Sequence, residues 1–394
     1  CGQCITHCPT GALRERDDTE TVFDALADPD KIVLVQIAPA VRSAWGEELG
    51  IPREEATVER LACALRRVGF EYVFDTDFSA DLTIMEEGSE LLERLGKAAK
   101  GEGDSRGWPM FTSCCPGWVR FLKSQFPEMT GRLSTAKSPQ QMFGAIAKSY
   151  YAEKMGIDPK DIYVVGVMPC TAKKFETKNS ESNAVEGLYD VDVAITTREL
   201  ARMIERAGIH FTSLPDGEFD APLGMSTGAG SIFGATGGVM EAALRTAADW
   251  LTGGEMKKLN FEEVRGVAPI KEATYKIGDL ELHVAVTSGL ANARKVLESV
   301  KSGEKHYDFI EIMGCPGGCV NGGGQPVQPA EVRNFVDLRA MRAAGLYADD
   351  AGKAVRKSHE NPAIQELYKD FFGEPGSHLA HEVLHTHYRE RSRF

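Results

Sequence analysis

The sequence lacks any long hydrophobic run. The longest candidate, IVLVQIAPAV at residues 32–41, is interrupted by Gln36 and Pro39. It is about half the length of the ~20 apolar residues that a membrane helix needs. We therefore expect no membrane span. Internal repeats and low-complexity tracts are also missing, which argues against a repeat protein.

Positive charge is scarce relative to negative charge. Lys and Arg together number 45 against 58 Asp and Glu, so the net charge is −13. This balance disfavours nucleic acid and anionic membranes as partners. The chain begins at Cys1 rather than Met. We expect a fragment or a processed chain whose targeting signal cannot be read, so we expect the cytoplasm but keep the periplasm open.

A disulfide framework is not indicated either. The cysteine count is odd and the spacing uneven in a large chain, which points to reduced thiols gathered in clusters for metal. Cys63 is the exception, because it lies on the apolar face of a helical pattern and is interpreted as a packing residue. The nine cysteines stand at positions 1, 4, 8, 63, 114, 115, 170, 315 and 319.

Strand and helix patterns alternate, which predicts an α/β core. Buried strands are expected near 31–37, 107–113, 161–168 and 307–313, and a capping box at Ser138 and Gln141 predicts a helix start. Each strand runs directly into a proline or cysteine segment. Sites in parallel sheets form beyond the carboxyl ends of strands. Cysteines distant in sequence are therefore expected to meet in one cleft.

The opening segment reads C-x2-C-x3-C-P at Cys1, Cys4 and Cys8. It matches the last three cysteines of the bacterial ferredoxin run. In two-cluster ferredoxins the final cysteine serves the other cluster, so Cys8 is expected to serve one accessory cluster and Cys1 and Cys4 the nearer one. Neither cluster has all its ligands in this chain. A zinc knuckle is the alternative.

Four further cysteines supply the number of thiolates that a [4Fe–4S] cube needs. They are Cys115, Cys170, Cys315 and Cys319, and only the last two are close in sequence. Structural zinc usually uses two local pairs, and buried inert cysteines are the other alternative. Cys114 adjoins Cys115, but neighbouring side chains point in different directions. The two thiols are therefore expected to do different jobs.

Two other motifs are interpreted as lacking the binding site that each one resembles. HEVLH at 381–385 matches the H-E-x-x-H zinc motif, but only nine residues follow it, so we interpret it as accidental. GAGSIFGATGG at 228–238 resembles a dinucleotide loop, yet no clear strand precedes it. A tightly packed or cofactor-hugging loop is favoured there.

Three segments together carry a specific resemblance. FTSCCPGWVRF, MPCTAKKFE and EIMGCPGGCVNGGGQP, in this order, resemble the signature segments of [FeFe]-hydrogenases. The resemblance implies an α/β, two-lobed iron-only hydrogenase catalytic domain with mixed sheets flanked by helices. It implies the end of a 2[4Fe–4S] ferredoxin-like module at 1–20, the catalytic domain at 27–330, and a helical, small-subunit-like segment wrapping it at 331–394.

The resemblance also implies an H-cluster, a [4Fe–4S] cube joined to a two-iron subsite that carries carbon monoxide, cyanide and azadithiolate. Cys115, Cys170, Cys315 and Cys319 would hold the cube, with Cys319 in the bridging position. Lys173 matches the lysine that hydrogen-bonds a cyanide. Many members have Ser in place of Ala40. The other implied wall residues are Ala38, Pro39, Ala40, Gln140, Met168, Phe233 and Met313.

A proton path is implied as well. Glu87, Glu90 and Arg94 are spaced i, i+3, i+7 and fall on one helix face. From spacing alone a solvated charged face is favoured. With Ser134 and Cys114, however, these positions match the family's path from the surface to the cluster.

The implied activity is that of a ferredoxin hydrogenase, the reversible reduction of protons to H2. Implied partners are ferredoxin or a similar low-potential carrier and hydrogenase maturation factors, with accessory [4Fe–4S] clusters in the full-length protein. Two alternatives stay open, a Narf-type iron–sulfur assembly factor and an H2-sensing regulatory hydrogenase. Cys114, Lys173 and the complete third segment argue against the assembly factor.

Overall fold

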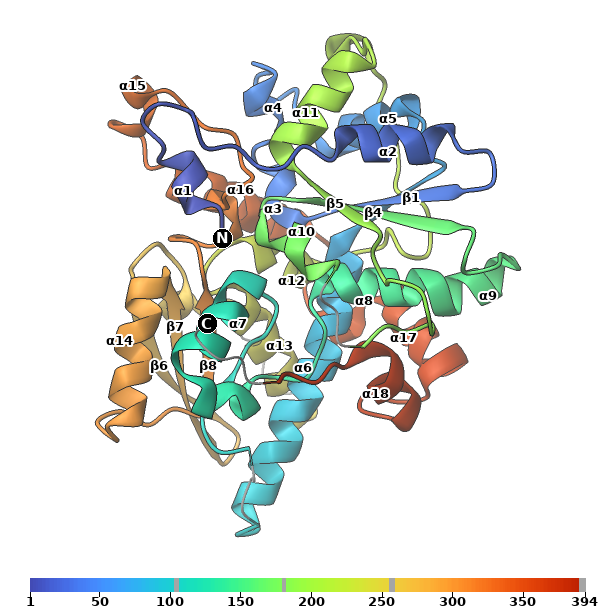
Figure 1. Cartoon of the computed structure of the whole chain (residues 1–394). Helices are drawn as coiled ribbons and strands as arrows, with labels where there is room; N and C mark the ends of the chain where they lie inside the picture. Colours follow the sequence, from blue (N-terminus) through green and yellow to red (C-terminus); the bar gives the residue numbers. More distant parts are fainter. Residues whose placement is uncertain (103–105, 179–181, 255–258, 390–394) are drawn as a thin grey trace.

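Two four-stranded sheets form the centre of the protein (Figure 1). The computed structural model describes residues 1–102, 106–178, 182–254 and 259–389. The first sheet is parallel throughout, as expected of strands that read as continuous apolar runs. Its order is β2 (Tyr72–Asp75), β1 (Ile32–Ile37), β4 (Ile162–Met168) and β5 (Val193–Thr196).

The second sheet is mixed. β6 and β7 form an antiparallel pair, whereas β7 and β3 each pair with β8 in parallel. Its order is β3 (Met110–Phe111), β8 (Phe309–Met313), β7 (Leu280–Ser288) and β6 (Ile270–Ile277).

Helices cover both faces of each sheet, and the longest, α6, packs against α8, α12 and α13. The helices of the first half are α1 (Gln3–Thr6), α2 (Thr19–Ala27), α3 (Pro39–Arg42), α4 (Trp45–Glu48), α5 (Val58–Val68), α6 (Thr76–Ala99), α7 (Pro116–Gln125), α8 (Pro139–Ile146), α9 (Ala152–Met155) and α10 (Ala172–Glu176). Those of the second half are α11 (Thr197–Arg206), α12 (Gly228–Ser231), α13 (Gly238–Thr252), α14 (Leu290–Lys301), α15 (Ala330–Arg333), α16 (Leu338–Gly352), α17 (Pro362–Leu367) and α18 (His378–Leu384).

Alternation along the strands divides the core into layers. In β1, Leu34 joins an apolar cluster with α8 and α17, whereas Val33 and Val35 join another with α5 and α11. In β8, Phe309 packs toward α13, and Ile310 packs toward α7 and α14. Both sheets are therefore buried on both faces, and the strand ends are the places left for a site.

The predicted α/β fold with helix-flanked sheets is confirmed, since the solved structures described below share it. The β6–β7 hairpin was not predicted. Its signal was the turn at Gly278, which has a φ of 60° and connects two alternating strands. The predicted helix start is confirmed, since α8 begins at Pro139 directly after Ser138. The capping box itself is wrong, because the Ser138 hydroxyl donates to Glu176 instead of capping α8.

The segment at 96–107 begins inside α6, which ends at Ala99. Its residues 103–105 lie outside the described part of the chain. A search of the described helices for one that is long and apolar enough to span a bilayer finds none.

Candidate active site

A single cavity lies where β1, β4 and β8 end, between the two sheets. It has about 580 Å³ of empty space. Every wall residue that the resemblance implied lines it, together with Cys114 and Lys173. The sequence reasoning had not singled out Thr76, Pro139, Pro169 and Gly234. The lining residues are Ala38, Pro39, Ala40, Thr76, Cys114, Cys115, Pro139, Gln140, Met168, Pro169, Cys170, Lys173, Phe233, Gly234, Met313 and Cys319.

Three of the four candidate ligand thiols, Cys115, Cys170 and Cys319, line this cavity, and the buried Cys315 lies beside them. Cys115 precedes the first residue of α7, and its Sγ accepts a hydrogen bond from Gly314 N–H at 3.3 Å. Burial raises the pKa of the Cys170 thiol, and Cys115 raises it further. The pKa of Cys319 is raised in the same way by burial and then by Cys115 and Cys170. Thiolates gathered so closely repel one another, so this donor set fits a cationic iron–sulfur cube that neutralises them.

The glycine-rich loop after β8 is held against the Cys170 segment. A Cβ on Gly322 would lie 2.1 Å from the carbonyl oxygen of Pro169, so only glycine fits there. Gly324 N–H also donates to Pro169 O at 2.8 Å. This close approach brings the two segments that carry Cys319 and Cys170 to the same site.

Lys173 is buried beside Cys114. Its Nζ donates to the Cys114 carbonyl at 3.1 Å and pairs with Glu176 at 2.9 Å. Burial works against the ammonium, but the Glu176 carboxylate outweighs it, and the pKa of Lys173 is raised. Glu176 also accepts from Ser138 Oγ and Gln140 Nε2, both at 2.9 Å. The sequence reasoning missed this carboxylate, although its spacing three residues after Lys173 was a usable signal.

The turn after β1 forms another wall. Pro39 opens α3, and the Ala40 carbonyl accepts from Gln325 Nε2 at 2.7 Å. A Cβ on Gly234 would lie 3.1 Å from the Ala40 Cβ. The wall at Ala40 is therefore closely packed. It offers a methyl group where many members of the family that the sequence resembles have the hydroxyl group of Ser.

Glu87 lies behind Cys114 on α6 and is 1% exposed. Neither of its carboxylate oxygens accepts a hydrogen bond from the described residues. Burial raises the pKa of Glu87 to about 8, and the neighbouring Glu90 adds to the shift. A buried, unpartnered carboxyl group with a pKa near neutrality is suited to taking up and releasing protons.

Glu90 follows one turn further along α6. Its Oε2 accepts from Ser134 Oγ at 3.1 Å and from Thr135 N–H at 2.9 Å, and its Oε1 pairs with Arg106 at 2.5 Å. Arg94 donates to Gly107 O at 2.6 Å and lies over the Trp108 ring. Glu87, Ser134 and Glu90 thus follow one another outward, while Arg94 contacts the 107–108 segment.

The N-terminal cysteines lie next to the third signature segment. Gln3 Nε2, in α1, donates to Asn321 O at 2.7 Å. The Cys315 thiol lies 3.8 Å from the Cys1 carbonyl oxygen, whereas Cys4 is exposed. The opening motif therefore lies on the outer side of the four-thiol site.

Two interpretations from the sequence are confirmed by packing. Cys63 lies against the apolar cluster of the first sheet. The 228–238 segment is tightly packed, because a Cβ on Gly230 would lie 2.5 Å from Asp77 O. Phe233, from the same segment, lines the cavity.

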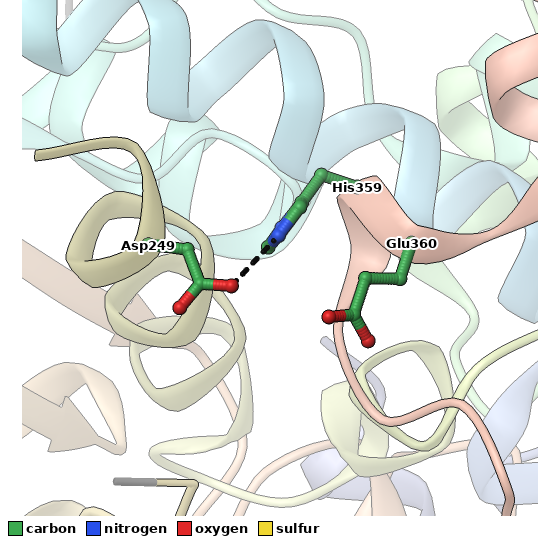
Figure 2. A group of neighbouring side chains, drawn as sticks. All are labelled: Asp249, His359 and Glu360. Carbon is green, nitrogen blue, oxygen red and sulfur yellow. Dashed lines mark hydrogen bonds and ion pairs between the residues drawn. The ribbon is translucent and has the colours of Figure 1, made fainter. Parts of the chain in front are cut away.

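Asp249, His359 and Glu360 form a second cluster of metal-ligating side chains (Figure 2). Lys357 pairs with Asp249 at 2.5 Å and with Glu360 at 3.4 Å, and His359 Nε2 lies 3.1 Å from Asp249. The lysine ammonium thus takes the place beside both carboxylates that a metal ion would need. We do not assign a metal there.

These features define an α/β protein that gathers four thiols between two sheets. Residues 31–323 match the family described as iron only hydrogenase large subunit, C-terminal domain, and residues 336–391 match iron hydrogenase small subunit. The chain belongs to the iron-only hydrogenase large-subunit family.

Individual relatives agree with this assignment. The chain is 56% identical over its whole length to the NADP-reducing hydrogenase subunit HndD of Solidesulfovibrio fructosivorans. It is 47% identical over 97% of its length to iron hydrogenase 1 of Clostridium pasteurianum. It spans just under two thirds of these relatives, 66% and 65%.

A solved structure shares the fold over nearly the whole chain. A variant of the [FeFe]-hydrogenase HydA1 from Chlamydomonas reinhardtii has 43% identity and a TM-score of 0.83, covering 95% of this chain and 99% of that one. Cytosolic iron-sulfur assembly component 3 of Bos taurus is 28% identical over 98% of the chain and 82% of that protein.

Proposed function

We propose that this protein is an [FeFe]-hydrogenase catalytic subunit that reversibly reduces protons to H2. The observation that carries the proposal is a cavity lined by Cys114, Lys173 and three of the four candidate ligand thiols. The fourth, Cys315, lies close enough to the other three for each of them to raise its pKa. Cys115, Cys170, Cys315 and Cys319 would hold the cube of an H-cluster. When bound, this cofactor would supply the metal centre at which protons are reduced by electrons delivered from outside the site.

The protein's own groups would orient the cofactor and move protons. Lys173 would offer its ammonium group to an anionic ligand in a pocket closed to bulk water. Gln140, Met168, Phe233, Met313 and the 38–40 turn would form the remaining walls. Cys114 would hold the proton nearest the cavity and exchange it with Glu87, and Ser134 and Glu90 would continue the path toward the surface.

Electrons would arrive at the outer side of the site, where the opening motif lies. Cys1, Cys4 and Cys8 would contribute to accessory [4Fe–4S] clusters, and a carrier such as ferredoxin would reduce them. A nicotinamide-linked partner is the second candidate, because a 56% identical relative is named an NADP-reducing subunit. We propose the cytoplasm as the compartment and maturation factors as further partners. The division at 1–20, 27–330 and 331–394 remains our proposed domain organisation.

The test is to mature the protein with an assembled diiron subsite, then record infrared spectra and H2 production from reduced methyl viologen. We expect bands of bound carbon monoxide and cyanide and rapid H2 production. An assembly factor would bind iron but give no such bands. A sensor would give the bands with slow turnover. Cys319→Ala, matured identically, is the control for signals that do not come from the site.

A further inference from the structure

The chain's C-terminal helix brings a histidine pair to the outer end of the Glu87–Glu90 row. His385 is only 4% exposed. Its Nδ1 lies 2.8 Å from Thr135 Oγ1, and its Nε2 lies 2.8 Å from Glu86 Oε2. The His381 ring lies beside it, with 4.1 Å between the ring centroids. Both ring nitrogens of His385 are engaged in hydrogen bonds, which leaves neither free to ligate the zinc of an H-E-x-x-H site.

Backbone contacts fix His385 in this position. Residues 384–386 run beside 135–137, with Lys137 N–H donating to Leu384 O at 2.9 Å and Thr386 N–H to Thr135 O at 2.8 Å. The buried Lys137 ammonium also donates to Val383 O at 2.7 Å. The imidazole is therefore held by main-chain pairing on the segment that carries Ser134 and Thr135.

Thr135 connects the histidine to Glu90. Its hydroxyl lies 3.2 Å from Glu90 Oε2, the same oxygen that accepts from Ser134 Oγ. Hydrogen bonds thus run without a break from Glu86 through His385 and Thr135 to Glu90. Glu86 is further held by the Tyr368 hydroxyl and by Gly376 N–H.

The direction of these hydrogen bonds suits proton transfer. The two terminal carboxylates accept, so the groups between them must donate. When His385 carries a proton on each nitrogen, it donates to Glu86 on one side and to Thr135 on the other, and Thr135 donates to Glu90. Every hydrogen bond then has one donor and one acceptor, which is the arrangement along which protons move most easily.

Water reaches this end of the row. A pocket with about 820 Å³ of empty space is lined by Glu86, Glu90, Glu93, Arg106, His381 and His385. Glu93 and Arg106 are paired with Lys97 and Glu90. His381 is exposed to solvent. The pocket therefore joins solvent to a titratable imidazole and to the outermost glutamate of the path.

We propose that His385, with His381 beside it, is the proton-relay residue that exchanges protons between pocket water and Glu90. This inference rests on the proposed hydrogenase function. In H2 production, the Nδ1 proton of His385 passes to Thr135 Oγ1 while the Thr135 hydroxyl proton passes to Glu90 Oε2. A hydronium ion in the pocket then returns one proton to His385 and becomes water, so charge and atoms balance. In H2 oxidation the same transfers run in reverse.

The test compares His385→Gln with the matched control His378→Gln in matured protein at equal iron content. His378 lies on the same helix but is exposed and outside the pocket. Water can partly replace the relay at low pH, where protons are plentiful. We expect His385→Gln to slow H2 production about tenfold at pH 8 and by about threefold or less at pH 6. This is less than the roughly 10²–10⁴-fold typical of losing a general acid–base group, because pocket water partly replaces the relay. His378→Gln should match the parent throughout.

Two further variants separate relay from structure. Thr135→Val should slow turnover as His385→Gln does, whereas Thr135→Ser, which keeps the hydroxyl, should not. In His385→Ala, added imidazole should restore the rate at pH 8, and pyrazole, which has a similar shape but little basicity, should not. A melting temperature and infrared bands equal to the parent's would show that the fold and site are intact.

Distinct results would overturn each proposal. If the parent is fully loaded and active but His385→Gln has an unchanged pH profile, the relay is wrong and the hydrogenase function stands. Rescue by pyrazole as well as by imidazole would reduce His385 to a space-filling role. A fully loaded parent that makes no H2 would overturn both proposals.

Discussion

At the scale of single residues, the neighbouring thiols Cys114 and Cys115 face different demands. Cys115 Sγ is turned toward Gly314 N–H, whereas Cys114 lines the cavity and packs against the apolar cluster that contains α13. We therefore propose Cys115 as a ligand and Cys114 as the group between the cavity and Glu87. Substitutions at the two positions should fail in different ways.

We expect Cys115→Ala to lose the cluster and its iron, and Cys114→Ala to keep both while turnover falls by about 10²–10⁴-fold, as for loss of a general acid–base group. Cys114→Asp should recover part of the rate, because a carboxyl group also carries a proton. Cys114→Ser should recover little. The measurements are iron content, infrared spectra and H2 production. Turnover near the parent's in a fully loaded Cys114→Ala would leave Cys114 as packing.

The buried Glu87 carboxyl group predicts how the free energy of unfolding depends on pH. The pKa of Glu87 in the folded state is about 8, above its ordinary value of 4.5. At a pH between these two values, the folded state keeps a proton on Glu87 that the unfolded state has released. The contribution of this proton to the free energy of unfolding is fully present below pH 4.5 and is lost as the pH rises through 8. Glu87→Gln cannot ionise and escapes that loss.

The free energy of unfolding of the parent should therefore fall relative to Glu87→Gln between pH 5 and 9, by on the order of a few kcal/mol. Urea denaturation at matched iron content measures the difference. Glu93→Gln is the control on the same helix, because Glu93 is exposed and paired with Lys97. Parallel pH curves for Glu87→Gln and the parent would contradict the buried-carboxyl interpretation.

At the scale of helices and strands, α8 is held closely against the segment before β5. A Cβ on Gly144 would lie 2.2 Å from the Asp190 carbonyl oxygen. Asp190 also pairs with the buried Lys137, which limits how far the segment can move. Gly96 is the opposite case, since it is an exposed glycine of α6 with nothing near its missing Cβ.

We expect Gly144→Ala to destabilise the protein by about 1–3 kcal/mol through overpacking, although alanine is the better helix former. Gly96→Ala should be neutral or should stabilise by up to about 1 kcal/mol. Thermal and urea denaturation of the two variants check this pair. Equal effects of both substitutions would show that helix propensity, rather than packing, determines how Gly144→Ala changes stability.

The sequence predicts these elements unevenly, and the reasons are physical. β1, β4 and β8 are largely apolar runs, with one polar residue in β1 and one in β8, and they can be recognised without their partners. The Ser138 capping box failed because Glu176, from a different element, competes for the hydroxyl. Thr76 escaped notice as a site residue because only the fold brings it to the cavity. Glu176 was missed although its spacing three residues after Lys173 was a signal. The contacts of His385 depend in the same way on the pairing of 384–386 with 135–137.

At the scale of the whole molecule, the candidate cluster site joins segments that are otherwise far apart in sequence. Cys115 follows β3 and Cys315 follows β8 in the second sheet, while Cys170 follows β4 in the first. A bound cube would therefore link the two sheets. Binding to the folded state alone raises stability by mass action.

We expect iron removal to lower the melting temperature and to increase proteolysis at the join between the sheets. The free energy of unfolding should fall by at least a few kcal/mol, since metal binding at a site assembled only on folding adds directly to folding free energy. Calorimetry of cluster-free and reconstituted protein measures it. Cys63→Ala, outside the site, should show the same difference on iron removal as the parent. Identical melting curves with and without iron would argue against a cluster that bridges the sheets.

The pairing of β3 with β8 also sets an order of events during synthesis on the ribosome. All four strands of the first sheet lie between residues 32 and 196, so that sheet can form while the rest of the chain is still being made. β3, at 110–111, has to wait for its partner at 309–313. Domains fold as their parts emerge. The nascent chain therefore carries Cys115 and Cys170 for more than a hundred residues of translation before Cys315 and Cys319 are synthesised. A cluster can bind to all four cysteines only near the end of translation or after it.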